Sequence, residues 1–247
     1  MNADVVIVGA GPAGIFTALE MLRKGSRQKI VMVEKGQSVE KRHCPKDKTK
    51  KCMNCKPYCH ITTGFSGAGA FSDGKLSLSY EVGGDLPNLI GADLAQETIH
   101  YADQIYLEFG ADEHIEGLEH EEERKEIRRR AIQAGLKLVD CPIRHMGTEK
   151  AQAIYLGIEK YLLNNGVEIY FGYECSNLIL ENDVCKGVSV SNGKTDLEIY
   201  AQHTVVATGR RGLTGWRSSA RSTTLPMRPA RWISASGWRS ATRLWRW

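Results

Sequence analysis

The sequence predicts an α/β fold in which a parallel sheet with a β-meander is split by an inserted α+β segment. Three observations carry this prediction. A glycine-rich turn joins an apolar run at the N-terminus to an amphipathic helix, a second glycine-rich stretch follows at 62–79, and a β-rich stretch runs from 166 to 209. We expect residues 1–79 and 165–209 to form one domain, residues 80–164 to form the inserted segment, and residues 210–247 to be a separate tail.

The N-terminal turn has a spacing that is typical of dinucleotide binding. An apolar β run at 5–8 is followed by Gly9-Ala10-Gly11-Pro12-Ala13-Gly14, with the spacing G-x-G-x-x-G, then by a helix and a second β run that ends at Glu34. The glycines allow a tight turn and the close approach of a pyrophosphate, which the helix N-terminus attracts. The carboxylate accepts hydrogen bonds from ribose hydroxyls. This order predicts a Rossmann-like unit. The acid disfavours the 2′-phosphate of NADP, so FAD and NAD remain.

Two later stretches favour FAD over NAD. Residues 166–210 are expected to form a strand, a β-meander with a turn at Asn192-Gly193, and a last strand that ends before Thr208-Gly209. In the two-dinucleotide-binding flavoproteins, which this arrangement resembles, such a run returns the chain to the first strand near the FAD. The loop at 62–79 includes Gly67-Ala68-Gly69, and its small residues allow backbone amides to lie against a flavin or a phosphate. The alternative for this loop is a flexible linker.

Several motifs together resemble the family of largely uncharacterised FAD-dependent dehydrogenases of bacteria and archaea. They are EKG at 34–36, four cysteines between 44 and 59, GFSGAGAFSDGKLSLS at 64–79, RHMGTEK at 144–150 and TVVATGR at 204–210. The resemblance covers residues 1 to about 212. It implies FAD binding by Gly9, Gly11, Gly14 and Glu34 with help from Lys35 and Arg42, and a flavin face near 64–75.

The activity that this resemblance implies is flavin-mediated two-electron oxidoreduction of a small-molecule substrate that it does not name. NAD(P)H is one candidate for the electron donor. Two other classes stay open: an NAD-binding enzyme without flavin, and a non-catalytic fragment or binding module. The N-terminus lacks a basic region ahead of its apolar run, and no apolar run reaches the length of a membrane helix, so we expect a cytoplasmic protein without a membrane span.

The inserted segment is expected to form a small substrate or cap domain. Helical periodicity extends over 91–110 and 120–135, and a long helix is expected to end at Asn164-Asn165-Gly166. His145 is the candidate for proton transfer, because its unperturbed pKa suits that role, although a structural histidine is the alternative. Arginines at 128–130 are offset by four glutamates between 121 and 126, which disfavours nucleic-acid binding.

Four cysteines lie close together with the spacing C-x7-C-x2-C-x3-C; they are Cys44, Cys52, Cys55 and Cys59. Because the chain has seven cysteines, an odd number, and no secretory signal, metal or redox chemistry is favoured over a disulfide framework. Three interpretations stay open. They are a zinc or iron–sulfur site, a redox dithiol beside a flavin, and a lysine-rich surface loop with idle thiols.

The tail at 210–247 differs in composition from the rest of the chain. It holds nine arginines, all five tryptophans and no acidic residue, whereas the net charge of the whole chain is only +4. A nucleic-acid arm, a membrane-surface segment and a product of the wrong reading frame are the alternatives. We favour the last, since restoring one base near Gly212–Leu213 gives a balanced, strand-like reading. On this hypothesis the tail is aberrant and disordered, no nucleic-acid partner is expected, and the chain is a truncated flavoprotein with weak or no activity alone.

Overall fold

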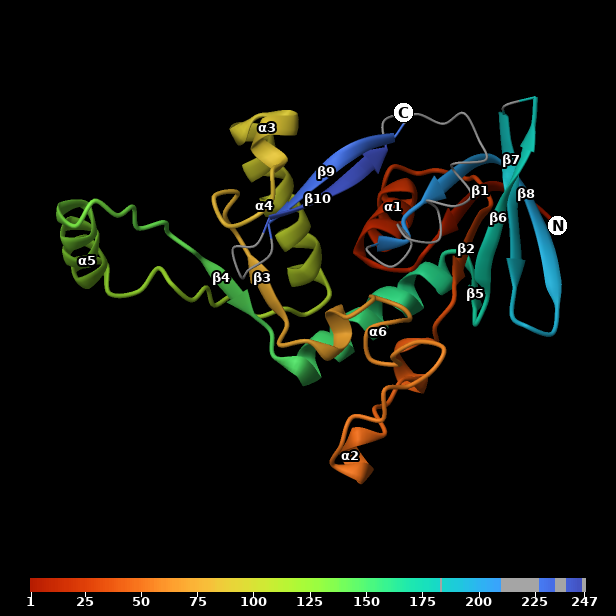
Figure 1. Cartoon of the computed structure of the whole chain (residues 1–247), viewed down its shortest axis with the longest axis horizontal. Coiled ribbons are helices and arrows are strands. Elements are labelled where there is room, and N and C mark those ends of the chain that lie inside the picture. Colours follow the sequence, from red (N-terminus) through yellow and green to blue (C-terminus); the bar gives the residue numbers. More distant parts are fainter. Residues whose placement is uncertain (183, 210–226, 234–238, 246–247) are drawn as a thin grey trace. The chain divides into compact units, whose positions relative to one another are not determined.

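The computed structural model describes residues 1–182, 184–209, 227–233 and 239–245 (Figure 1). The chain divides into two compact units. Unit 1 comprises Met1–Ser72 with Thr148–Thr223, and unit 2 comprises Asp73–Gly147 with Thr224–Trp247. These boundaries differ from the expected ones, because the long helix at 148–164 packs within unit 1 and not within the inserted segment.

A six-stranded mixed sheet forms the centre of unit 1, in the order β5-β2-β1-β8-β7-β6. The first four of these are mutually parallel and the last two continue the sheet antiparallel. The strands are β1 (Asn2–Val8), β2 (Ile30–Glu34), β5 (Glu168–Phe171), β6 (Glu174–Glu181), β7 (Val184–Ser191) and β8 (Asp196–Val206). The predicted parallel sheet with a β-meander is therefore confirmed, and β8 returns beside β1 as expected.

The core of unit 1 lies on both faces of its parallel strands. Every residue of β2 is buried, and so are the last four residues of β1. Strands that are covered on both faces carry continuous apolar runs, which is the pattern seen in the sequence. Helix α1 (Pro12–Arg23) buries Ile15, Ala18 and Leu19, while Val188 and Ile199 of the meander join the cluster around Val6.

The predicted hairpin turn at Asn192-Gly193 joins β7 to β8. The side-chain oxygen of Asn192 accepts from the backbone amides of Lys194 and Thr195, at 2.9 and 2.7 Å. Gly193 has φ +81°, a conformation that glycine adopts without a steric cost. The sequence signal is therefore confirmed, in a loop two residues longer than the shortest hairpin turn.

Helix α6 (Thr148–Asn164) contacts two short 3-10 turns of unit 1, Val39–Lys41 and Gly69–Phe71. Its buried Glu159 accepts from the backbone amide of Val39 at 3.1 Å, and burial raises the pKa of this carboxyl group. The helix is followed by Gly166 at φ +86°, as the Asn-Asn-Gly signal predicted. These contacts place α6 against the loops that follow β2.

Unit 2 contains helices α3 (Leu86–Ile90), α4 (Ala92–Glu108) and α5 (Glu121–Gln133), and a two-stranded sheet of β3 (Lys75–Ser77) and β4 (Ile143–His145). The predicted helices at 91–110 and 120–135 are present. The guanidinium of Arg144 forms a bidentate pair with Asp103 of α4, at 2.6 and 2.7 Å, and also donates to the carbonyl of Asp112. Both charged side chains are buried, so this pair ties β4 to α4.

The tail contains β9 (Met227–Ile233) and β10 (Arg239–Trp245), which pair antiparallel. The expectation of disorder is therefore wrong for these residues. The rest of the tail lies outside the described residues. No helix in the described part of the chain is long and apolar enough to cross a membrane.

Candidate dinucleotide-binding site

The glycine loop, residues 9–14, lies where β1 ends and α1 begins. Gly9 has φ +103°, and a Cβ placed there would lie 2.5 Å from the carbonyl oxygen of Ala207. A Cβ at Gly14 would lie 2.0 Å from the carbonyl oxygen of Gly9. Real Cβ atoms do not come so close to backbone atoms, so both positions require glycine for close packing of the loop.

Gly11 differs from Gly9 and Gly14, because the space beside it is open. Its φ of −78° suits any residue, and among the described residues a Cβ placed there would meet nothing within 4 Å. Gly11 caps α1 without a side-chain hydrogen bond, and the first turn of the helix contains no acidic residue. Uncapped amides at a helix N-terminus bind anions, so this open space fits a pyrophosphate.

Glu34 lies at the end of β2 and bonds back to the glycine loop. One carboxylate oxygen accepts from the amide of Ala10 at 2.9 Å, and the other accepts from the amide of Gly36 at 2.8 Å. The side chain is only 7% exposed. Each oxygen has a second lone pair, so the carboxylate can hold the loop and still accept from a ribose hydroxyl.

The second glycine loop, residues 64–70, is joined to the first through Ser66. The amide of Ser66 donates to the carbonyl of Ala10 at 2.7 Å, and its hydroxyl accepts from the amide of Ala70 at 3.0 Å. Phe65 is fully buried and packs edge-to-face on Phe171 of β5. A flexible linker is therefore the wrong interpretation of this stretch.

Small residues of the second glycine loop have two different roles. A Cβ at Gly67 would meet no described atom within 4 Å, so this residue borders open space as Gly11 does. A Cβ at Gly69 would lie 2.8 Å from the hydroxyl oxygen of Tyr155, so Gly69 is needed for packing against α6. Ala68, between them, is exposed. The sequence pattern could not separate these roles, because they depend on which neighbour each residue faces.

Arg42 is buried and holds the second glycine loop in place. Its guanidinium donates to four backbone carbonyls, those of His60, Ile61, Phe65 and Gly67, and lies 4.5 Å from the centroid of the Phe71 ring. Burial lowers the pKa of Arg42 to about 10, although the charge of Glu34 opposes this shift. Four of its five donors are thus used within the protein, so Arg42 positions the loop.

Thr208 and Gly209 follow β8, and Thr208 lies beside the glycine loop. The amide of Ala207 donates to the carbonyl of Val8 at 2.8 Å, and the Cα of Thr208 would lie 3.3 Å from a Cβ at Gly9. Lys35 instead pairs with Glu174 of β6 at 3.2 Å. The ends of β1, β2 and β8 thus meet at one edge of the sheet, which is where open α/β sheets bind dinucleotides.

A comparison with known protein families agrees with this geometry. The DAO family, described as FAD-dependent oxidoreductase, matches residues 4–234. The chain belongs to this family. An uncharacterized protein of Clostridium beijerinckii is 43% identical over 77 residues, which are 31% of this chain and 14% of that protein.

Several solved structures show the same fold at low identity. L-amino acid deaminase from Proteus vulgaris is similar with a TM-score of 0.51 at 20% identity, over 93% of this chain and 52% of that chain. Glycine oxidase from Bacillus cereus has a TM-score of 0.52 at 16% identity, over 93% of this chain and 62% of that chain. THI4 from Thermovibrio ammonificans has a TM-score of 0.50 at 13% identity, over 92% of this chain and 64% of that chain. The chain thus spans about half to two thirds of these proteins.

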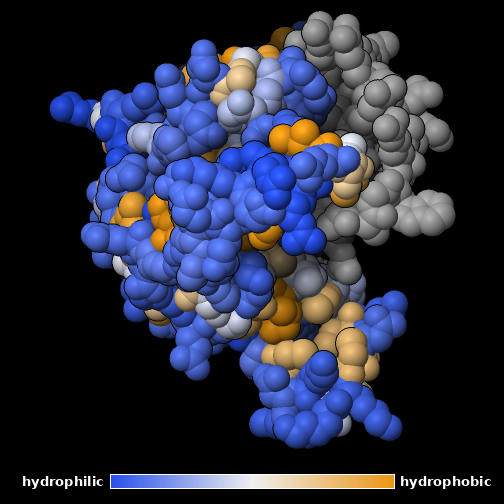
Figure 2. All heavy atoms as spheres, turned by 90° about the vertical axis from the view of Figure 1, so that its left-hand side faces the viewer, coloured by the Kyte–Doolittle hydropathy of each residue, from blue (hydrophilic) through white to orange (hydrophobic). Residues whose placement is uncertain are grey.

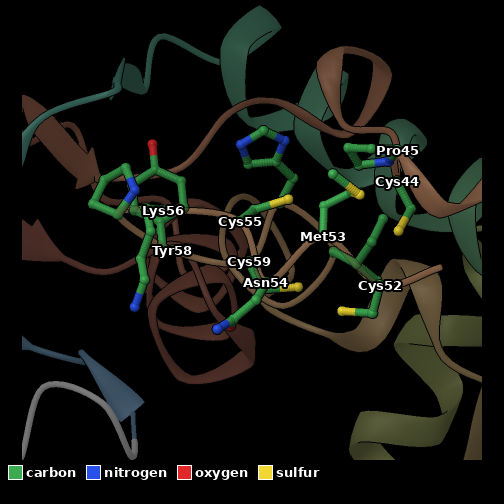
Figure 3. A pocket seen from close by; sticks show the side chains of 12 residues that line it. Cys44, Pro45, Cys52, Met53, Asn54, Cys55, Lys56, Tyr58 and Cys59 are labelled. Carbon is green, nitrogen blue, oxygen red and sulfur yellow. The ribbon is translucent and has the colours of Figure 1, made fainter. Parts of the chain in front are cut away.

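The four cysteines between 44 and 59 line one pocket of about 150 Å3 (Figure 3). All seven cysteines of the chain are in the thiol form. Across the described ranges, no three Cys, His, Asp or Glu side chains converge in a way that could hold a metal ion. The zinc or iron–sulfur site expected at Cys44, Cys52, Cys55 and Cys59 is not supported by this geometry and stays a prediction. The four thiols surround one pocket, but they do not converge on a single point.

His145 lies in unit 2 between two carboxylates. Its Nδ1 is 3.2 Å from Glu116 and its Nε2 is 3.4 Å from Asp73. Lys75, which pairs with His145 across β3 and β4, lies 2.7 Å from Asp73 and, with His145, lowers the pKa of that carboxyl group. The sequence indicated His145 alone, because Asp73 and Glu116 are 72 and 29 residues away along the chain.

Proposed function

We propose that this chain binds FAD, and that the whole protein carries out flavin-mediated two-electron oxidation of a small-molecule substrate. The observation that supports FAD binding most is the open space beside Gly11, which faces the uncapped N-terminus of α1. Glu34 and Ser66 both bond to Ala10 next to this space. Family membership supports FAD as the dinucleotide.

Each part of the site has a binding role on this proposal. Amides of the glycine loop and of the first turn of α1 hold the pyrophosphate, and the carboxylate of Glu34 accepts from the ribose hydroxyls. The second glycine loop presents small residues toward the cofactor, and Arg42 keeps that loop ordered. FAD, when bound, supplies the acceptor for the two electrons, while the protein binds and orients the reactants.

The substrate side of the proposal rests on unit 2. His145 can hold or move a proton, because its ring lies within reach of both Asp73 and Glu116 and its side chain is 34% exposed. Turnover is proposed for the whole protein, since this chain spans only 52% of the length of the L-amino acid deaminase.

The proposal predicts that the purified full chain binds FAD in preference to NAD+. Equilibrium dialysis of each dinucleotide against the chain should show saturable binding of FAD, with a dissociation constant about tenfold or more below that for NAD+. AMP serves as the control for recognition of the adenosine part alone. Tight binding of NAD+ by a chain that does not retain FAD would instead favour an NAD-dependent enzyme without flavin.

A further inference from the structure

A lobe of unit 1 projects between Arg42 and His60, and we call residues 43–59 the cysteine lobe (Figure 1). The lobe is closed at its base, because Nε of Arg42 donates to the carbonyl of His60 at 2.9 Å. A second tie joins the hydroxyl of Tyr58 to the carbonyl of Lys35 at 2.7 Å. The two ends of the lobe are therefore held together at its base, and the lobe begins nine residues after Glu34.

The pocket described above is built entirely from this lobe and its base, residues 44–61. The side chains of Cys44, Cys52, Cys55 and Cys59 surround it (Figure 3). Cys52 is exposed and the other three are half-buried, so solvent reagents reach the pocket. Figure 2 shows a projection at its lower edge, at the height that α2 (Lys46–Thr49) has in Figure 1. Hydrophobic and hydrophilic residues lie next to each other on this projection.

Cys52 and Cys55 are separated by two residues and line the same pocket. Asn54, between them, has φ +46°, a left-handed conformation. C-x-x-C is the usual spacing of redox-active dithiols. Cys175, by contrast, lies in β6 and donates to the carbonyl of Asn177, and burial raises its pKa to about 12. Because a raised pKa disfavours the thiolate, Cys175 serves as an internal control.

The charge around the pocket is strongly positive. Exposed lysines stand at positions 46, 48, 50, 51 and 56, and the one acidic residue from 43 to 60 is Asp47. The amino group of Lys50 donates to the backbone carbonyl of Asp47 and not to its side-chain carboxylate. A surface of this kind attracts anions and repels cations at low ionic strength.

We propose that Cys52 and Cys55 form a redox-active dithiol whose substrate is a disulfide that carries negative charge. The thiolate of Cys52 attacks one sulfur of the disulfide RSSR, forms a mixed disulfide and releases one RS−. The thiolate of Cys55 then attacks the sulfur of Cys52 and releases the second RS−. With the two thiol protons taken up by the leaving groups, the balance is two cysteine thiols plus RSSR giving one protein disulfide and two RSH.

The first test follows the products of oxidation in the full chain. After incubation with oxidised glutathione, alkylation and peptide mass spectrometry should find one intramolecular disulfide, between Cys52 and Cys55. Cys55→Ser should accumulate glutathione on Cys52, because the second attack is lost, and Cys52→Ser should form neither product. Cys44→Ser, Cys59→Ser and Cys175→Ser should behave as the unsubstituted chain does.

The second test addresses the charge of the substrate. Oxidised glutathione is anionic and cystamine is cationic, and both are symmetric disulfides. The rate with glutathione disulfide should fall severalfold from low to high salt, whereas the rate with cystamine should rise or stay constant. In the double variant Lys50→Glu with Lys51→Glu the lobe holds three lysines and three carboxylates, so the difference in salt dependence between the two disulfides should be largely lost.

Three results would overturn the proposal. They are a lack of intramolecular disulfide at any ratio of oxidised to reduced glutathione, a disulfide that persists in Cys52→Ser, and rates that do not depend on the sign of the charge. All measurements use the chain without added FAD, so their outcome is independent of the proposed flavin chemistry.

Discussion

Replacing Asp103 by asparagine is expected to lower the free energy of unfolding by about 3–5 kcal/mol. Asp103 and Arg144 are 5% and 3% exposed, and two short hydrogen bonds join them. The variant removes one charge of a buried pair and leaves the guanidinium in a poorly solvated place, which costs more than the net value of the pair. Chemical denaturation followed by far-UV circular dichroism measures the change.

A matched surface pair provides the control. Asp140 also contacts two arginines, Arg124 at 3.3 Å and Arg128 at 2.6 Å, but its side chain is 41% exposed. Water solvates the charges when such a pair is broken, so Asp140→Asn should cost less than about 1 kcal/mol. Equal effects of the two substitutions would contradict the structural role that we assign to the buried pair.

Replacing Arg42 by lysine is expected to lower the free energy of unfolding by roughly 3 kcal/mol and to weaken FAD binding about tenfold or more. Lysine keeps the charge, but a single ammonium group cannot reach all four carbonyls that the guanidinium now satisfies. Several buried acceptors would lose their donor, and the second glycine loop would lose its support. Thermal unfolding and FAD titration measure the two effects.

Lys41→Met is the control for this substitution, because Lys41 is the exposed neighbour of Arg42. It should change neither stability nor FAD binding appreciably. If Arg42→Lys bound FAD as the unsubstituted chain does, Arg42 would have no part in ordering the loop beside the cofactor.

Local signals in the sequence were sufficient for the architecture of unit 1. These signals act over short distances along the chain, so the order of strand, turn, helix and strand follows from them. They are the apolar runs of β1 and β2, the G-x-G-x-x-G spacing and the acid at 34. The turn at Asn192-Gly193 and the return of β8 beside β1 are of the same kind. The close contacts at Gly9 and Gly14 also agree with roles that the motif assigns to its glycines.

Contacts between distant segments could not be predicted in the same way. The bond from Ser66 to Ala10 spans 56 residues, and the four carbonyls bound by Arg42 come from a loop 18 to 25 residues away. Such contacts have no periodicity, so the sequence did not indicate that Arg42 holds the second glycine loop or that α6 lies within unit 1. The cysteine spacing alone does not decide whether the four thiols hold a metal, since it fixes neither the direction of the side chains nor their convergence.

The most direct test of FAD binding at the glycine loop is a titration of the Gly11→Ala variant. A methyl group there meets no described protein atom and the backbone conformation permits alanine, so the fold should lose no more than about 1 kcal/mol. The same methyl group would occupy the space that we assign to the pyrophosphate, and the dissociation constant for FAD should rise about tenfold or more. Gly193→Ala, in the remote hairpin turn, should destabilise the chain by about 1 kcal/mol or more, because φ there is +81°, without changing that constant. Unchanged FAD affinity in Gly11→Ala would contradict the site.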